Sequence, residues 1–176
     1  PRIDPARIAL VGWSKGGMVA DWASRSRYRD ALHPRDRAGF ASHVAFYPWC
    51  GEQQVPVALT GAPLLYLLGE DDDWTGAEPC RDYARRVVVA GHDVRVHVFA
   101  GAEHGFDQAG RFRRALPEAE SWARCSYLWS PTRFTIVETG KALAWDQYAA
   151  YVAACSRRGA HAGSNVEARA ASRALL

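Results

Sequence analysis

The chain has 176 residues, of which 48% are hydrophobic and 11% aromatic, and its formal net charge is +3. This composition excludes a disordered chain, and the length suits one domain with a hydrophobic core. The excess of basic over acidic residues is too small, and the basic residues are too scattered, to indicate nucleic-acid binding. No apolar run is long enough to span a membrane. We therefore expect a globular domain that binds neither nucleic acid nor a membrane.

Strand and helix patterns alternate along the chain. Short apolar runs bounded by turn residues predict strands, and apolar residues at helical spacing predict helices. The strands are expected at 7–12, 42–49, 62–69 and 93–100, and the helices at 16–26, between Thr75 and Gly91, at 141–159 and at 165–175. Such alternation predicts an α/β fold with a mostly parallel sheet flanked by helices.

Two segments of the second half carry more specific signals. Thr75 and Glu78 have capping-box spacing, Pro79 would lie in the first helical turn, and Gly91 is placed to end that helix. The segment 110–140 interrupts the alternation, and its "RFTIVE" predicts a small extra strand. We interpret this segment as an excursion before the terminal helices.

A glycine-rich turn joins the first strand to the first helix. In "LVGWSKGGMV", Gly12 and Gly16 flank Ser14, which gives the G-x-S-x-G pattern of a nucleophile elbow. In such a turn the flanking positions must lack a Cβ, the serine hydroxyl stands above the sheet, and the amide of the next residue, Lys15, can donate to an oxyanion. A glycine-rich connection without chemistry is the alternative, so the pattern needs partners in the order serine, acid, histidine.

Acidic residues follow the third strand. Asp71, Asp72 and Asp73 all stand where the acid of such a site belongs, at the carboxyl end of a strand. A solvated acidic turn leading to Thr75 would explain at least one of them. Spacing alone does not choose among the three.

A histidine follows the fourth strand in a glycine-flanked loop. His104 lies between Gly101 and Gly105, where its ring is free to reach both a serine and an acid. His104 would take the proton from Ser14 as the hydroxyl attacks an acyl carbon. The other five histidines stand in the linker before the second strand, beside a helix end, within a strand or near the tail: His33, His43, His92, His97 and His161.

The four cysteines leave two interpretations open. Cys50, Cys80, Cys125 and Cys155 can form two disulfides, with three possible connectivities, or remain four thiols. Their spacing does not fit a zinc site, and we expect neither a metal nor another cofactor.

Several segments are similar to the dienelactone hydrolase family of the α/β-hydrolase superfamily. The similarity lies in "VGWSKGG", "LLYLLGEDDDWTGAEPC", "FAGAEHGFD" and the tail "CSRRGAHAGSNVEARAASRALL". The resemblance implies a hydrolase that cleaves small-molecule carboxylic esters or lactones through an acyl-serine intermediate. It implies Ser14 as nucleophile and His104 as base, and it favours Asp72 as the acid.

The chain departs from the family pattern at two positions. Lactone-cleaving members have a cysteine where this chain has Ser14, and they have an arginine shortly after the histidine where this chain reads "GFDQ". A serine depends on the histidine as proton acceptor more than a thiol does. The serine favours an ordinary serine esterase, and the missing arginine argues against dienelactone itself as the substrate.

The resemblance also implies that residues 1–176 are the C-terminal portion of one truncated α/β-hydrolase domain. The only methionine, Met18, lies inside the glycine-rich turn, so we expect the natural polypeptide to extend upstream. Strand 7–12 would then lack a neighbour, and we expect the isolated chain to be marginally stable and weakly active or inactive. The alternatives are a non-catalytic fragment and a related serine hydrolase that acts on peptides or acetylated sugars.

Overall fold

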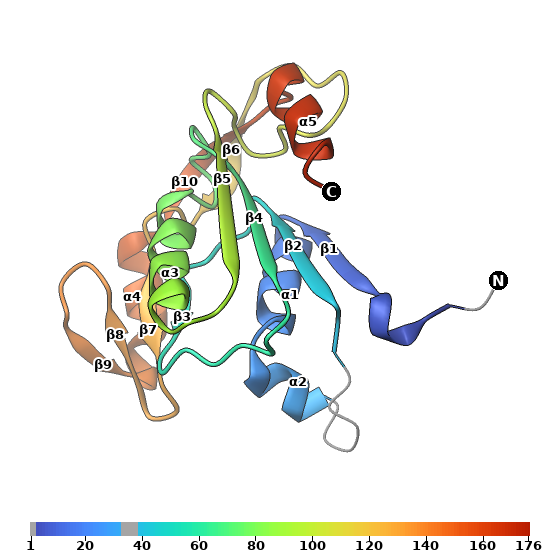
Figure 1. The fold of residues 1–176 in the computed structure, drawn as a ribbon. Coiled ribbons are helices and arrows are strands. Elements are labelled where there is room, and N and C mark those ends of the chain that lie inside the picture. Colours follow the sequence, from blue (N-terminus) through green and yellow to red (C-terminus); the bar gives the residue numbers. More distant parts are fainter. Residues whose placement is uncertain (1–2, 33–38) are drawn as a thin grey trace.

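A parallel sheet forms the centre of the chain. The structure, a computed structural model, describes residues 3–32 and 39–176, so His33 lies outside the described residues. The sheet has four strands in the order β1-β2-β4-β5, and every pairing in it is parallel (Figure 1). Its strands are β1 (Ala9–Trp13), β2 (Ser42–Phe46), β4 (Leu64–Gly69) and β5 (Val94–Phe99). These are the four strands expected from the sequence, within a few residues at their ends.

Helices cover both faces of this sheet. The helices are α1 (Lys15–Ala23), α2 (Ser26–Leu32), α3 (Glu78–Val89), α4 (Tyr148–Cys155) and α5 (Val166–Arg173), with short 3₁₀ turns at Pro5–Arg7 and Trp145–Gln147. On one face, Ala20 of α1 and Tyr83 of α3 belong to the same buried cluster as Tyr66 of β4. On the other face, Ala168 of α5 packs with Phe99 and its neighbours. This is the α/β arrangement that the alternating pattern predicts.

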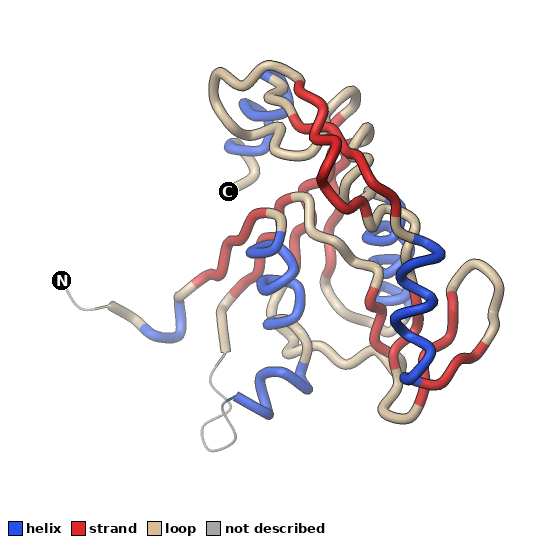
Figure 2. Tube along the Cα trace, turned by 180° about the vertical axis from the view of Figure 1, so that it is seen from behind, coloured by secondary structure: helices blue, strands red, loops and turns tan. Residues whose placement is uncertain are grey.

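The excursion after β5 builds two further sheets. Strands β6 (Arg114–Ser121) and β10 (Arg157–Ala162) pair antiparallel and form the long ribbon beside α4 in Figure 2. The other sheet has the order β3-β7-β8-β9, with β3 (Glu52–Gln54), β7 (Tyr127–Trp129), β8 (Arg133–Ile136) and β9 (Ala142–Ala144). The small strand expected at "RFTIVE" is β8, whereas β3 and the β6–β10 pair were not expected.

The prediction of a single helix over 141–159 is wrong. Its first residues form β9 because Ala142–Ala144 pair with β8, and only Tyr148–Cys155 are α-helical. Ser156 is extended and Gly159 has φ 92°, a conformation that favours glycine and not a helix. Tertiary pairing therefore overrides the helical propensity of this alanine-rich stretch.

Two helix boundaries also differ from expectation. The first helix ends at Ala23, and α2 is a separate helix rather than a continuation of it. Ala77, not Thr75, is the N-cap of α3, although Pro79 lies in the first turn and Gly91 follows the end of the helix with φ 83°. The hydroxyl of Thr75 has other partners, which are described below.

All four cysteines are paired. Disulfides join Cys50 to Cys80 and Cys125 to Cys155, each across 30 residues of sequence. The first ties the segment after β2 to the start of α3, and the second ties the segment before β7 to the end of α4. Of the two interpretations left open by the sequence, the structure contains the disulfides.

Strand β1 lies at one edge of the central sheet. It pairs with β2, and no other strand among the described residues lies on its far side. Ile8 just before it is 41% exposed, and Trp13 at its end is 45% exposed. None of the helices in the described ranges has the length and apolar character needed to cross a bilayer.

Candidate active site

Ser14 occupies a strained turn between β1 and α1. Its backbone has φ 53° and ψ −116°, a region that non-glycine residues rarely adopt. The Ser14 amide donates to the carbonyl of Phe46 at 3.0 Å, which ties the turn to the end of β2. The turn therefore holds Ser14 directly after the carboxyl end of β1, beside the end of β2.

Two glycines make room for this turn, but one of them is not the glycine that the pattern predicts. A Cβ on Gly12 would lie 1.9 Å from the carbonyl oxygen of Gly16, and a Cβ on Gly17 would lie 2.7 Å from the carbonyl oxygen of Phe46. A Cβ on Gly16 would meet nothing within 4 Å. The expectation that Gly16 must lack a Cβ is therefore wrong, and Gly17 fills that role because it packs directly against β2.

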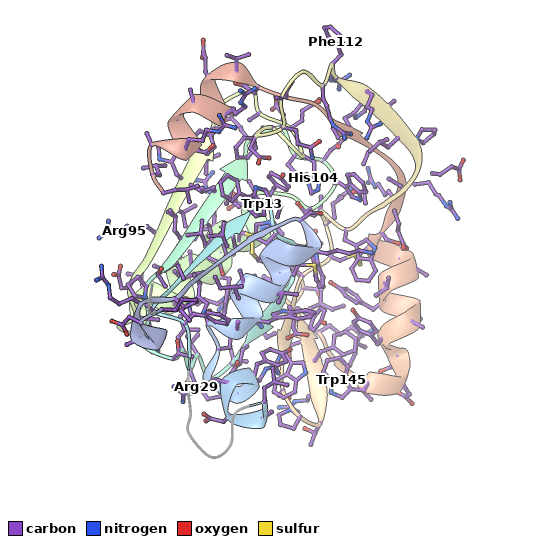
Figure 3. The ribbon with its side chains drawn as sticks, turned by 90° about the vertical axis from the view of Figure 1, so that its right-hand side faces the viewer. Trp13, Arg29, Arg95, His104, Phe112 and Trp145 are labelled. Atoms are coloured by element: carbon purple, nitrogen blue, oxygen red, sulfur yellow. A yellow bond between two sulfur atoms is a disulfide. The ribbon has the colours of Figure 1, made fainter. Side chains whose placement is uncertain are left out.

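His104 lies between Ser14 and Asp72. Its Nε2 is 2.9 Å from the Ser14 hydroxyl, and its Nδ1 is 2.8 Å from Oδ2 of Asp72. The rings of Tyr47 and Trp74 pack against the imidazole, with centroids 4.6 and 4.7 Å from it. His104 is buried, and it lies beyond the end of the central sheet, near Trp13, in Figure 3.

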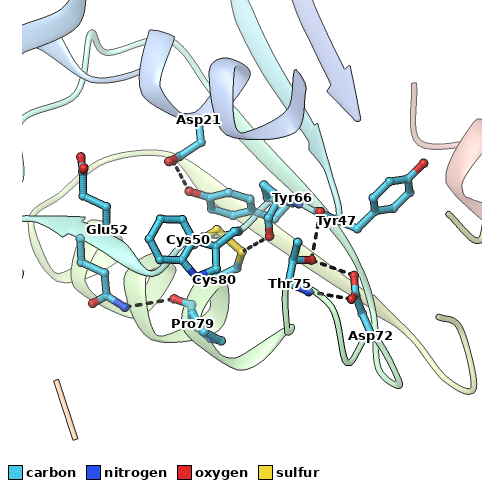
Figure 4. Close-up of a disulfide and its surroundings, with 12 residues drawn as sticks. Asp21, Tyr47, Cys50, Glu52, Tyr66, Asp72, Thr75, Pro79 and Cys80 are labelled. Atoms are coloured by element: carbon cyan, nitrogen blue, oxygen red, sulfur yellow. Dashed lines mark hydrogen bonds between the residues drawn. A yellow bond between two sulfur atoms is a disulfide. The ribbon is translucent and has the colours of Figure 1, made fainter. Parts of the chain in front are cut away.

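Asp72 is buried and accepts several hydrogen bonds. The amides of Trp74 and Thr75 donate to its Oδ1 at 2.9 and 3.0 Å, and the Thr75 hydroxyl lies 2.9 Å from its Oδ2 (Figure 4). Burial alone would raise the pKa of Asp72, but the hydrogen bond and charge of His104, together with the bonds from Thr75, outweigh it. The pKa of Asp72 is therefore lowered, which favours the carboxylate.

The other two candidate acids lie outside this chain of hydrogen bonds. Asp71 is exposed. Asp73 accepts from the His161 amide at 2.8 Å, and its Oδ2 lies 2.7 Å from Nδ1 of the same residue, so it fastens β10 to the loop after β4. Of the three consecutive acids, the structure brings Asp72 to His104.

Sequence reasoning missed Tyr47 and the role of Thr75. Tyr47 has φ 35°, packs on His104 and donates its hydroxyl to Asp107 at 2.6 Å. The Thr75 hydroxyl also lies 3.2 Å from the carbonyl oxygen of Tyr47. Figure 4 shows this hydrogen bond near the Cys50–Cys80 disulfide. The only sequence signal at Thr75 was its capping-box spacing, which pointed to the helix instead.

The Lys15 amide stands in the first turn of α1. Backbone N–H groups there have no partner within the helix, so this amide is free to donate to an anion beside Ser14. Within residues 3–32 and 39–176, no group of three histidine, cysteine, aspartate or glutamate side chains is arranged to hold a metal ion.

Ser14 lies at the junction of two cavities. One cavity of about 290 Å³, which we name the polar pocket for His104, Arg111 and Arg114 in its walls, is also lined by Trp13 and Trp74. A mostly apolar groove of about 400 Å³ extends the other way, past Lys15 and along α1. The two arginines follow His104 by seven and ten residues, beyond the "GFDQ" segment in which the sequence lacks an arginine.

The fold of the chain matches part of the α/β-hydrolase fold. The structure resembles a thermophilic esterase from the Planctomycetes species Thermogutta terrifontis, with a TM-score of 0.50 and 19% identity over 61% of this chain and 49% of that one. It also aligns with the carboxylesterase Cest-2923 from Lactobacillus plantarum, with a TM-score of 0.46 and 19% identity over 61% of this chain and 50% of that one. The chain thus spans about half the length of these solved structures, and at such low identity the likeness concerns the fold alone.

The sequence match is more specific. The profile of the dienelactone hydrolase family matches residues 1–152. The chain belongs to the dienelactone hydrolase family, as the resemblance of its segments predicts. No curated protein sequence matches the chain.

Proposed function

We propose that this chain carries the catalytic centre of a serine hydrolase that cleaves carboxylic esters or lactones. Ser14 is the nucleophile, His104 the general base and acid, and Asp72 the group that orients the imidazole. One observation carries the proposal: hydrogen bonds of 2.9 and 2.8 Å link the Ser14 hydroxyl through His104 to a buried carboxylate. This sequence of groups is what acyl transfer to a serine requires.

Acylation begins with proton transfer. Nε2 of His104 accepts the hydroxyl proton of Ser14 while the serine oxygen forms a bond to the acyl carbon. The carboxylate of Asp72 accepts a hydrogen bond from Nδ1, which fixes the tautomer and stabilises the imidazolium. The bond from the acyl carbon to the leaving oxygen then breaks, and that oxygen takes the proton from Nε2.

The developing oxyanion needs donors close to Ser14. The Lys15 amide supplies one, and a single donor of this kind lowers the barrier by about 3 kcal/mol. Deacylation reverses the roles: His104 takes a proton from water, the hydroxide attacks the acyl carbon, and the Ser14 oxygen leaves with the proton from Nε2. The products are a carboxylic acid and the free enzyme.

Covalent labelling tests this proposal without depending on rapid turnover. A fluorophosphonate probe should label the 176-residue chain at Ser14 and should not label Ser14→Ala. Ser130→Ala is the matched control, because Ser130 lies in the loop between β7 and β8 and its hydroxyl bonds only to Arg133 among the described residues. Hydrolysis of p-nitrophenyl butyrate is followed in parallel, and it should disappear in Ser14→Ala alone.

The two alternatives give different results. A non-catalytic fragment shows neither labelling nor hydrolysis, and that result would refute the proposal. A hydrolase of peptides or acetylated sugars is labelled at Ser14 but cleaves acetylated xylose or a short peptide much faster than simple esters.

A further inference from the structure

Four tryptophans surround the groove that leads away from Ser14. We use the term tryptophan groove for the walls formed by Met18, Val19, Trp22, Trp49, Trp74 and Trp122. Lys15, Thr75 and Glu120 supply the remaining polar lining besides Ser14. The tryptophans come from four parts of the chain, since Trp22 lies on α1, Trp49 follows β2, Trp74 follows β4, and Trp122 follows β6.

Hydrogen bonds fix the orientation of two of these indoles. The Nε1 of Trp49 donates to the carbonyls of Trp122 and Cys125 at 3.0 and 3.1 Å, and the Nε1 of Trp74 donates to the carbonyl of Glu120 at 3.2 Å. Trp122 packs edge-on against Trp49 with ring centroids 5.1 Å apart. Because the N–H groups of Trp49 and Trp74 are already satisfied, these rings present apolar surfaces to the groove, and they are held in place before any ligand binds.

The position of His104 decides which part of a substrate occupies the groove. His104 gives its proton to the leaving group, so the leaving group must lie on the histidine side of Ser14. Ser14 lines both cavities, whereas His104 and the two arginines line the polar pocket and not the tryptophan groove. The acyl group of an ester attached to Ser14 therefore extends into the tryptophan groove.

We propose that the tryptophan groove is an acyl-binding site for esters of arylalkanoic acids, in which a flat aromatic ring is held among Trp22, Trp49 and Trp122. This inference rests on the proposed function of Ser14. A groove of about 400 Å³ lies within the range of sites that enclose small organic ligands, and a small acyl group such as acetyl would leave most of it empty. Aromatic rings gain more from aromatic walls than their buried area alone provides.

The lining also disfavours a polyhydroxylated acyl group. Each buried hydroxyl needs a hydrogen-bond partner, and an unpaired one weakens binding. The Thr75 hydroxyl already bonds to Asp72, and the indole N–H groups of Trp49 and Trp74 bond to carbonyls. The remaining polar lining is limited to Lys15, Glu120 and the indole N–H groups of Trp22 and Trp122, which are fewer donors and acceptors than a sugar-like acid presents.

Three p-nitrophenyl esters test the proposal, because their common leaving group isolates the acyl side. The 3-phenylpropanoate and 3-cyclohexylpropanoate esters differ only in ring type, and the acetate ester gives the baseline. We expect the full chain to show a kcat/KM for the phenyl ester at least about 3-fold above that for the cyclohexyl ester. In Trp122→Ala and in Trp22→Ala, we expect the ratio of kcat/KM for the phenyl ester to that for the acetate ester to fall about 10-fold or more.

Trp13→Ala is the matched control for these variants. Trp13 is a tryptophan beside the same serine, but it lines the polar pocket. Its removal should change the rates of all three esters together and leave their ratios unchanged. Trp122→Phe guards against a folding defect in Trp122→Ala, because it retains an aromatic ring and should retain most of the phenyl preference.

A binding measurement separates this inference from the proposed function. In Ser14→Ala, quenching of tryptophan fluorescence by ethyl 3-phenylpropanoate and ethyl 3-cyclohexylpropanoate reports affinity for the groove without any acyl transfer. A tighter Kd for the phenyl ester, lost when Trp22→Ala is added, supports the inference even if the parent chain is not labelled by fluorophosphonate. Equal affinities, or ratios that Trp22→Ala and Trp122→Ala leave unchanged, would overturn the inference even if Ser14 is the nucleophile.

Discussion

The two glycines on either side of Ser14 should respond to alanine in opposite ways. In Gly12→Ala the new Cβ would lie 1.9 Å from the Gly16 carbonyl oxygen and 2.2 Å from its carbonyl carbon. Both atoms belong to the backbone of α1, so they cannot move aside as a flexible side chain would. In Gly16→Ala the new methyl group has open space around it.

The magnitudes follow from these contacts. Overpacking in a rigid site costs about 1–3 kcal/mol, and a clash between backbone segments places Gly12→Ala at about 3 kcal/mol or more. For a domain of this size, 1 kcal/mol shifts the melting temperature by about 2–4 °C, so we expect a loss of about 6–12 °C. Gly16 lies within α1 and its φ is not positive, so alanine should stabilise the fold by about 0.4–1 kcal/mol.

Differential scanning calorimetry of the two variants and the parent chain measures both shifts under one set of conditions. Near-ultraviolet circular dichroism establishes that each variant retains the native packing of its tryptophans at low temperature. If Gly12→Ala melts within about 1 °C of the parent, or if Gly16→Ala is the more destabilised of the pair, the steric account of this turn is wrong.

Other features of the structure lead to three further predictions. Asp72→Asn should lower kcat for ester hydrolysis by about 10⁴-fold, because the imidazole loses its orienting carboxylate. Asp73→Asn, which loosens β10, should lower kcat less than about 10-fold. Similar losses of kcat in the two variants, measured by steady-state kinetics, would contradict the assignment of Asp72. Replacing Cys125 and Cys155 together with serine removes a cross-link over 30 residues, so the free energy of unfolding in urea titrations should fall by about 3–4 kcal/mol. Equal stability of the reduced and oxidised parent chains would contradict this prediction. Burial lowers the pKa of His43, so the folded state binds fewer protons than the unfolded state, and stability should fall as the pH drops below the ordinary value of 6.5; His43→Leu should flatten that fall in melting scans from about pH 7 to pH 5, and an unchanged slope would assign it to other groups.

The central sheet was predictable because its signals are local. Strands β1, β2 and β4 are short, mostly apolar runs, and β5 alternates valines with polar residues. Cys80, Tyr83, Ala84 and Val87, which have helical spacing on α3, are all buried in the core. The β6–β10 pair was not predictable from these rules, because β6 is mostly exposed and the two strands lie far apart in the chain. The same rules wrongly predicted one helix over 141–159 for a related reason. Pairing with β8 makes Ala142–Ala144 a strand, and the extended Ser156 ends the helix that follows it.

The candidate site was predictable in part. The positions of Ser14 and His104 follow from turns at strand ends, which leave a sequence pattern. The choice of Asp72 came from family resemblance, since three adjacent carboxylates look alike until the fold aims one of them at the imidazole. Tyr47 and the tryptophan groove left no pattern at all, because their rings come from distant parts of the chain and meet only in three dimensions.

The site residues and Trp122 lie on different parts of the fold, the central sheet and the segment 110–140, and this has an evolutionary consequence. Ser14, Asp72 and His104 all stand on turns of the parallel sheet, while Trp122 stands on a segment anchored by its own disulfide, Cys125–Cys155. Under the proposed function, changes of sequence and length in that segment alter the tryptophan groove while Ser14, His104 and Asp72 keep their spacing. Homologues that differ in this segment are then expected to differ in substrate preference while they share the same three site residues.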